Sequence, residues 1–491
     1  MKARLMFRDM DFKSTHDPKF SDDYLADDLE LQRIIEVMAQ DDNSIRISCR
    51  AAIFCPLQSI QDIRYRQEIL RDAFLNPDTV RQLYDITLEA EKRKRGLWHW
   101  LSPSTYLSSN FSTAITLLKL YVEILMQLRN IADKRLSDFQ SEGFRNLFIM
   151  FQRELDDDYF SEVRTQLDSL NDRDGMLVSA MMGSYLQGVR YTLRRKTSKD
   201  TWLRWVFSPS YTIAPRDDSG ATDLGKRRDR AINEATNALA QAAEHLEGFF
   251  AMLKGELAFY VGILNLVDRL REIGVPICIP SLLPLESKDR SWEGLYDVSL
   301  ALLKTDGVIG NDLDAKDKRL YVITGANQGG KSTFLRSVGQ AQLMMQCGMF
   351  VSATNFCAPI RSGVYSHFKK EEDTAMKSGK LDEELSRMSK IAELLEEGSL
   401  MLFNESFAAT NEREGSEICR QITQALVENG VEVFSVTHLH TYACAFLKEK
   451  STDFLCAERL DDGTRTYKIV PGKPLQTAFG EDLYNQIFGK R

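Results

Sequence analysis

A glycine-rich segment, GANQGGKS at residues 325–332, constrains the fold of this chain more than any other feature. It follows the apolar run 319–324 and precedes a helix-forming run, 332–346. In such a strand–loop–helix context, the pattern G-x-x-x-x-G-K-[ST] turns backbone N–H groups and the helix N-terminus towards phosphates. The Lys331 ammonium then reaches the β and γ phosphates, and the Ser332 hydroxyl can ligate Mg²⁺. The segment therefore predicts a site for ATP and Mg²⁺.

An ordinary glycine-rich turn between a strand and a helix is the alternative, and the flanking patterns make it the weaker one. The residues predicted to hold the nucleotide at this loop are Gly325, Ala326, Asn327, Gln328, Gly329, Gly330, Lys331, Ser332 and Thr333.

Two further apolar runs follow the loop, SLMLFNES at 399–406 and VEVFSVTH at 431–438. Helical patterns at 332–346 and 381–397 separate these runs. Strands that alternate with helices predict a largely parallel sheet covered on both faces. Residues 281–491 are therefore expected to form an α/β domain.

The first half of the chain has helical periodicity instead. Apolar residues recur at intervals of three and four from Ile232 to Leu270, and no proline lies between Pro215 and Pro276. This pattern predicts a helix of about 45 residues that begins near Asp229. The predicted fold class is α plus α/β in several domains: an all-α half at 1–280, then a P-loop (ABC-like) α/β half at 281–491.

A P-loop ATPase needs an acid at the end of a second strand. The run SLMLFNES supplies Asn404 and Glu405 there, where Asp-Glu is usual. Glu405 can act as general base on the attacking water, whereas the Asn404 amide brings no charge to Mg²⁺. Slow hydrolysis, or binding without hydrolysis, is therefore an open alternative.

The third strand ends in His438, at the edge where α/β sheets bind ligands, so this side chain can contact the γ-phosphate. The predicted catalytic residues are Glu405, His438 and Lys331. The predicted metal ligands are Ser332, Asn404 and Glu405.

These segments resemble the ATPase domain of the MutS family of DNA mismatch-repair and recombination proteins. The resemblance covers about residues 300–485 and rests on TGANQGGKSTFLRSVG, SLMLFNESFAATNEREG, VTH, VIGNDLDA and PGKPLQTAFGEDL. It implies that Asn311 lies in an adenine pocket and that ATP binds between the ATPase domains of a homodimer. A weaker resemblance at 50–70 implies a helical core that continues into lever helices and a DNA-facing clamp.

The sequence departs from the family pattern in two places. Only about 45 residues precede the segment at 50–70, so we expect a short form without mismatch-recognition and connector domains. The Ser-Thr pair of the family is replaced by MKSGKLDEEL at 376–385. There, Ser378 and Gly379 resemble an ABC-type signature that contacts the γ-phosphate of the partner, but a solvated helix start is an equal alternative.

Net charge excludes a surface coated uniformly with basic residues, because 63 Lys and Arg face 71 Asp and Glu. The segment from Leu186 to Arg230 is the exception, with eleven basic residues against five acidic ones. Basic residues interleaved with aromatics suit phosphate contact, although such a run is also typical of a solvated face. The residues expected to contact DNA are Arg190, Arg194, Arg195, Lys196, Lys199 and Arg204.

The eight cysteines are scattered without paired spacing, which predicts a reducing, cytoplasmic environment. The longest uncharged run, 97–118, contains Pro103 and many hydroxyl side chains, so no membrane span is expected.

Together these features predict a MutS-like DNA-binding ATPase, in which ATP binding and hydrolysis at a dimer interface control how helical levers engage DNA in repair or recombination. Two alternatives stay open. One is a nucleotide-gated dimerisation module with little hydrolysis, and the other is an ABC-type ATPase that acts on proteins without DNA.

Overall fold

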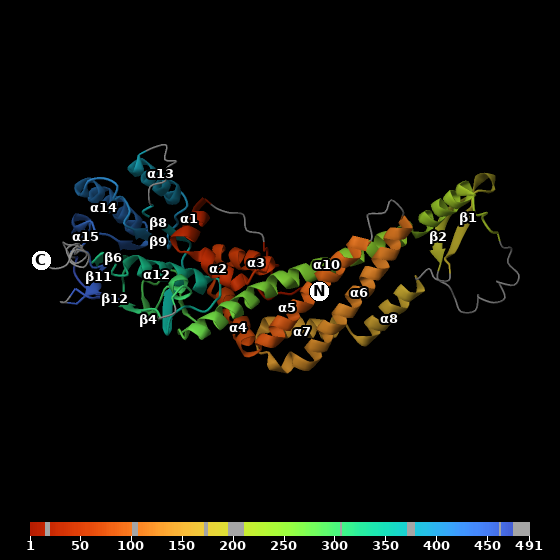
Figure 1. Ribbon diagram of the computed structural model, residues 1–491, viewed down its shortest axis with the longest axis horizontal. Coiled ribbons are helices and arrows are strands. Elements are labelled where there is room, and N and C mark those ends of the chain that lie inside the picture. Colours follow the sequence, from red (N-terminus) through yellow and green to blue (C-terminus); the bar gives the residue numbers. More distant parts are fainter. Residues whose placement is uncertain are drawn as a thin grey trace. The chain divides into compact units, whose positions relative to one another are not determined.

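The computed structural model of the protein describes residues 1–14, 20–100, 107–170, 175–194, 211–304, 307–370, 379–460 and 463–474. These residues group into two compact units. The first unit consists of Met1–Leu5 and Asn76–Leu257, and the second consists of Met6–Leu75 and Ala258–Arg491. Helices and sheets are both present, so the predicted mixture of all-α and α/β structure is confirmed at that level (Figure 1).

The first unit is mainly helical. Its elements are α5 (Pro77–Trp100), α6 (Leu107–Arg135), a 3₁₀ turn (Leu136–Asp138), α7 (Glu142–Glu154), α8 (Asp157–Ser169), the β1–β2 hairpin (Leu177–Met182 and Gly188–Arg194) and the first part of α10 (Asp218–Ile273). Aromatic side chains fill much of the interior, and the rings of Tyr121 on α6 and Phe250 on α10 lie 5.2 Å apart. Such buried aromatic pairs stabilise packed helices through the large apolar area that they remove from water.

Helix α10 is longer than its periodicity predicts, because it has 56 residues and begins at Asp218, ahead of the apolar stripe. The Asp217 side chain accepts a hydrogen bond of 2.8 Å from the Gly220 N–H, as a helix cap does. At the other end, Gly274 adopts a φ of 79° and donates its N–H to the Leu270 carbonyl oxygen at 3.1 Å. This left-handed glycine ends the helix.

The second unit contains a six-stranded sheet in the order β12-β11-β6-β10-β9-β8. Its strands are β6 (Leu320–Gly325), β8 (Val364–Phe368), β9 (Leu400–Asn404), β10 (Glu432–Val436), β11 (Thr452–Arg459) and β12 (Arg465–Pro471). All pair in parallel except β12, which is antiparallel to β11 at the edge. The predicted parallel arrangement of 319–325, 399–406 and 431–438 is therefore what the structure shows.

Helices cover both faces of this sheet, which explains why β6 and β10 are buried along their whole length. On one face, Met401 and Phe403 of β9 pack with α13 (Lys380–Ala392), α14 (Glu412–Glu428) and α15 (His440–Ala445). On the other face lies α12 (Lys331–Gln346), where Gly339 lets Leu402 of β9 approach closely. Figure 1 shows α12 and α14 on opposite sides of the strands.

A second, four-stranded sheet has the order β3-β7-β4-β5. Its strands are β3 (Ser281–Leu283), β4 (Arg290–Leu295), β5 (Asn311–Ala315) and β7 (Asn355–Pro359), and α11 (Val298–Ala301) follows β4. The remaining helices of the second unit are α1 (Phe20–Asp28), α2 (Leu31–Ala39), α3 (Asn43–Phe54) and α4 (Ile60–Leu75).

The contacts between residues divide the chain at other positions than the change in its composition does. Residues 6–75 are helical, yet they group with the C-terminal half: α1 lies beside β8, and the Ser366 hydroxyl of β8 donates to Asp28 at 2.7 Å. The division near residue 280 marks a change of composition and stays a prediction about domains.

Two helices are long and apolar enough to cross a membrane by length and composition alone, Leu107–Asp138 and Asp218–Ile273. Within the protein, 50% of the apolar window of the first helix and 78% of that of the second are buried. Core helices of ordinary globular proteins have the same properties, so the expectation of no membrane span stays a prediction.

Candidate nucleotide-binding site

The glycine-rich segment forms the connection between β6 and α12, at the C-terminal end of the parallel strands. Gly325 and Gly330 have positive φ angles of 112° and 90°. A Cβ atom on Gly329 would lie 2.8 Å from the Cβ of Ala457 on β11. Glycine is therefore required both for the turn and for the close approach to β11.

Lys331 begins α12 and is buried, with 5% of its surface exposed. Its Nζ donates to the carbonyl oxygens of Gly325 at 3.0 Å and Ala326 at 2.9 Å. Burial lowers the pKa of Lys331, while the nearby Glu405 carboxylate opposes this shift. The loop thus holds an ammonium group against its own backbone, where it can also meet an anionic ligand.

The end of β9 meets the loop directly. The Ser332 hydroxyl donates a hydrogen bond of 3.0 Å to Oδ1 of Asn404. Two neutral oxygen atoms that can act as metal ligands thus lie side by side. Among the described residues, no group of three His, Cys, Asp or Glu side chains is placed to hold a metal ion. This donor set fits Mg²⁺, which needs only one or two protein ligands when phosphates and water complete its shell.

Glu405 follows β9 in a left-handed backbone conformation, with a φ of 52°. Its N–H donates to the Val436 carbonyl oxygen of β10 at 2.9 Å, which fixes the turn beside His438. Nδ1 of His438 lies 3.8 Å from Oε1 of Glu405. His438 lowers the pKa of Glu405 most, and Lys331 and Lys369 add to the effect. The carboxylate is therefore ionised at neutral pH and able to accept a proton.

These residues line one open cleft of about 1310 Å³ in the second unit. The predicted residues that line it are Asn311, Asn327, Gln328, Gly329, Gly330, Lys331, Ser332, Thr333, Glu405 and His438. Asn404 does not line the cleft but accepts a hydrogen bond from Ser332, which does. Gly325 and Ala326, at the start of the loop, do not line it either, and their carbonyl oxygens accept hydrogen bonds from Lys331. The assignment of roles to these residues stays a prediction.

Asn311 has a structural task as well as a place in the cleft. It is 6% exposed, and its Oδ1 accepts the Ile469 N–H at 2.7 Å, which ties β5 to β12. The two predicted signature residues are placed differently. Gly379 precedes α13 and is not among the residues that line the cleft, and Ser378 lies outside the described residues.

Three basic or aromatic residues of the cleft were not predicted. Lys369 follows β8, and its N–H donates to the Asn404 carbonyl oxygen at 2.9 Å. Tyr467 lies on β12, with the Lys304 ammonium 6.0 Å from the centre of its ring. A pair of lysines, Lys369 and Lys370, follows directly after the short run VYSHF and was a usable sequence signal for Lys369. Tyr467 had no such signal, because β12 lies over 130 residues from the loop and carries no comparable pattern.

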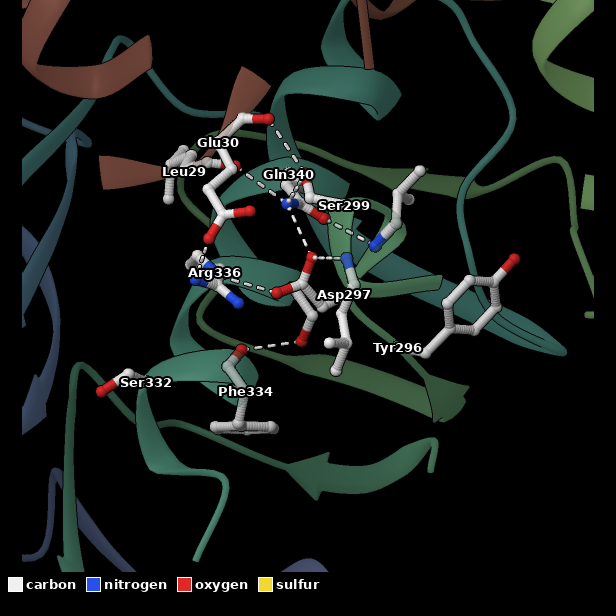
Figure 2. A network of polar contacts seen from close by, with 12 residues as sticks. Leu29, Glu30, Tyr296, Asp297, Ser299, Ser332, Phe334, Arg336 and Gln340 are labelled. Atoms are coloured by element: carbon white, nitrogen blue, oxygen red, sulfur yellow. Dashed lines mark hydrogen bonds and ion pairs between the residues drawn. The ribbon is translucent and has the colours of Figure 1, made fainter. Parts of the chain in front are cut away.

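A polar network holds α12, the helix that starts at the loop, against other segments of the second unit (Figure 2). Arg336 of α12 donates to Asp297 at 2.7 Å and also binds Glu30. One turn further on, Gln340 donates to Asp297 at 3.0 Å and to the Leu29 carbonyl oxygen at 2.9 Å. These contacts connect α12 with the α1–α2 junction and with the start of α11.

The predicted DNA contacts fall in the first unit and are only partly described. Arg190 and Arg194 lie on β2 with exposed side chains, and Arg194 donates to the Ser179 hydroxyl at 2.8 Å. Arg195, Lys196, Lys199 and Arg204 lie outside the described residues.

Comparison with known proteins identifies two domains. Residues 58–273 match the MutS2 N-terminal domain, and residues 321–480 match MutS domain V. A DNA mismatch repair protein MutS of a Thermotoga species is 31% identical over 172 residues, which are 34% of this chain and 22% of that protein. An Endonuclease MutS2 of Lacticaseibacillus casei is 29% identical over 254 residues, 48% of this chain and 31% of that protein.

An Endonuclease MutS2 of Thermus thermophilus is 33% identical over 171 residues, 33% of this chain and 22% of that protein. The alignments with these relatives thus cover less than a third of the length of each of them. The matched domains follow one another along the chain and cover most of it, which confirms the family expected from the loop and strand-end motifs. The chain belongs to the MutS family and is MutS2-like.

Proposed function

We propose that this protein is an ATPase of DNA repair or recombination, which binds and hydrolyses Mg-ATP in the cleft beside β6, β9 and β10. The hydrogen bond between Ser332 and Asn404 carries the proposal, because it brings the end of β9 to the glycine-rich loop. Ser332 and the proposed base, Glu405, line one cleft, and Asn404 adjoins it through its hydrogen bond with Ser332. MutS domain V, the family that matches this region, supports the assignment.

Each residue of the cleft has a separate role in the proposed reaction. Loop N–H groups and the Lys331 ammonium bind the phosphates, and Ser332 and Asn404 hold the metal ion. Bound Mg²⁺ neutralises charge that develops on the phosphate oxygens. Glu405 accepts a proton from the attacking water, and His438 donates a hydrogen bond towards the γ-phosphate.

The rest of the proposal concerns assembly. Two copies of the chain would close their clefts on ATP as a homodimer, with Ser378 and Gly379 of one copy near the nucleotide of the other. The nucleotide state would then change how the helical half engages DNA. The names of the relatives, DNA mismatch repair protein MutS and Endonuclease MutS2, support DNA as the partner.

Phosphate release at saturating Mg-ATP tests the enzymatic part. We expect Glu405→Gln to bind ATP normally and to lose about a hundredfold or more in kcat, because a positioned base contributes about 10²–10⁴-fold. Glu417→Gln, an exposed change on α14, is the matched control. Lys331→Ala should abolish ATP binding. Wild-type turnover in Glu405→Gln, or undiminished ATP affinity in Lys331→Ala, would contradict the proposal.

A second function is favoured by one observation, namely that Asn404 gives Mg²⁺ a neutral ligand where a carboxylate is usual. In that case ATP acts as a ligand that drives dimerisation without measurable turnover. Light scattering with and without Mg-ATP, together with phosphate release, separates the two: dimerisation without turnover identifies the binding module.

A further inference from the structure

The loop of the β1–β2 hairpin exposes a group of large apolar side chains. Tyr185 is 95% exposed, Leu186 is 82% exposed and Met182 is 75% exposed, with Met181 and Val189 beside them. We name these five residues the hairpin tip. Single exposed apolar residues are common on protein surfaces, but several of them gathered at the end of one hairpin are typical of an interaction site.

The base of the hairpin is fixed, so the exposure of the tip is not a result of fraying. Met176 and Leu193 pack against the buried cluster of Phe111, Ile115 and Ile232, which belongs to α6 and α10. The strands pair from Leu177↔Arg194 to Met182↔Gly188. Figure 1 shows the hairpin beside the start of α10. The tip is thus presented on a packed support.

Backbone conformation also distinguishes the tip. Tyr185 and Leu186 have φ angles of 61° and 60°, a left-handed conformation that normally favours glycine or asparagine. Each such residue is strained relative to glycine, because its Cβ atom lies close to the following carbonyl oxygen. Two bulky residues in succession at these positions are a costly way to make a turn, and strain of this kind clusters at functional sites.

Charge narrows the choice of partner. From residue 175 to 194 the hairpin contains Arg190 and Arg194 and no Asp or Glu. The start of α10, residues 218–230, lies beside the hairpin and contains four basic residues against three acidic ones, so the net charge of the region stays positive. A partner that fits must therefore present negative charge next to flat apolar surface. Nucleic acid with unstacked bases has both, because phosphates flank the faces of the bases.

We propose that the hairpin tip contacts DNA bases: Tyr185 and Leu186 lie against bases exposed at a gap, a branch or an end. Arg190 contacts an adjacent phosphate, and Arg194, at the base of the hairpin, contacts a phosphate further along the strand. The inference rests on the proposed DNA-binding function and adds a base contact to it. Aromatic side chains stack on any base, and apolar side chains of the size of leucine or methionine enter opened base steps. An anionic lipid surface is the competing partner, and the family assignment favours DNA.

The test uses the full chain and a duplex with a short gap that carries 2-aminopurine at the first unpaired position. We expect binding of the wild type to change the fluorescence of this base, as stacking on Tyr185 requires. Tyr185→Ala should weaken binding to gapped DNA about tenfold, remove the fluorescence change and leave binding to intact duplex within about twofold. Tyr185→Phe keeps the ring and should behave as the wild type.

Leu75→Ala is the control, because it removes another large apolar side chain that is 74% exposed and lies at the end of α4, outside the segment 186–230. Arg190→Gln should weaken binding to gapped and intact DNA alike and reduce the salt dependence of both, which separates phosphate contact from base contact. An unchanged unfolding midpoint of Tyr185→Ala shows that the fold is intact.

Three outcomes would overturn the inference in distinguishable ways. If the wild type binds gapped DNA and Tyr185→Ala binds it equally well with the same fluorescence change, the tip makes no base contact and the proposed function stands. If Tyr185→Ala instead abolishes binding to vesicles of phosphatidylglycerol while DNA binding is unchanged, the partner is a lipid surface. If the wild type binds no DNA even at low salt, the proposed function fails as well.

Discussion

The hydroxyl of Ser406 lies 2.8 Å from Nδ1 of His367 and 2.6 Å from the carbonyl oxygen of the same residue. Nε2 of His367 lies 3.0 Å from the Glu384 carbonyl oxygen, which can only accept, so Nε2 carries the proton. Burial lowers the pKa of His367 to about 3, and the ring is neutral. His367 thus connects α13 with the turn that contains Glu405.

This contact predicts an effect on catalysis. Glu405 and Phe407, on either side of Ser406, have φ angles of 52° and 59°, and such a turn needs outside contacts to hold it. We expect Ser406→Ala to lower kcat about tenfold with little change in ATP affinity, because a small displacement of the base is enough to slow proton transfer. Steady-state phosphate release and ATP titration measure the two quantities.

Ser416→Ala is the matched control. Ser416 is also buried, and its hydroxyl has no hydrogen-bond partner among the described residues. Its kcat should equal that of the wild type. Equal kcat values for Ser406→Ala and the wild type would show that the His367–Ser406 contact does not position Glu405.

The interaction between Glu405 and His438 predicts a pH dependence. Because His438 lowers the pKa of Glu405, the carboxylate stays ionised below its ordinary pKa, and activity falls only as the pH drops through the lowered value. In His438→Ala this main cause of the shift is absent, so the acid limb of the kcat profile should move to higher pH. Profiles between about pH 3 and 7 measure the shift, because the range must extend below the ordinary pKa of a glutamate.

His440→Ala serves as the control, because His440 begins α15 and contacts Cys444 instead of Glu405. An acid limb at the same pH in His438→Ala and the wild type would remove His438 as the cause of the lowered pKa.

Replacing Asn404 by Asp is predicted to strengthen the binding of Mg²⁺. Replacement by Asp places a charged oxygen beside Ser332, where the amide oxygen now accepts its hydrogen bond. We expect Asn404→Asp to reach half-maximal turnover at about tenfold lower Mg²⁺ concentration, because a carboxylate binds this hard cation more tightly than an amide does. Phosphate release across a magnesium series is the measurement. Asn355→Asp adds the same charge at an exposed site, and a like shift there would refute a local effect.

The network behind α12 predicts a loss of stability. Asp297 is 2% exposed and accepts hydrogen bonds from Arg336, Gln340 and the Leu300 N–H. Asp297→Ala leaves a half-buried guanidinium and a buried amide with fewer partners, so we expect it to lower the free energy of unfolding by about 3 kcal/mol. Urea denaturation measures the change. Asp317→Ala, at an exposed ion pair with Lys288, should leave the free energy of unfolding close to that of the wild type, and equal costs for the two variants would contradict the prediction.

Local patterns were enough to predict several parts of the molecule. The glycine-rich loop, the three strand runs at 319–325, 399–406 and 431–438, and the long helix that ends near Gly274 all follow from spacing within short segments. The residues that face the cleft from those segments, such as Lys331, Glu405 and His438, could be predicted for the same reason: parallel strands end at one edge of a sheet.

The tertiary structure decided what joins segments that are distant in sequence. It placed Tyr467 of the antiparallel edge strand at the cleft, joined α12 to Glu30 and Asp297, and grouped residues 6–75 with the C-terminal half. The helix α10 also begins earlier in the chain than predicted, at Asp218. The Asp217 side chain caps this end of the helix, although the apolar stripe starts further along. Periodicity reports which face of one element is apolar, but the partner that covers this face is selected by packing across the whole chain.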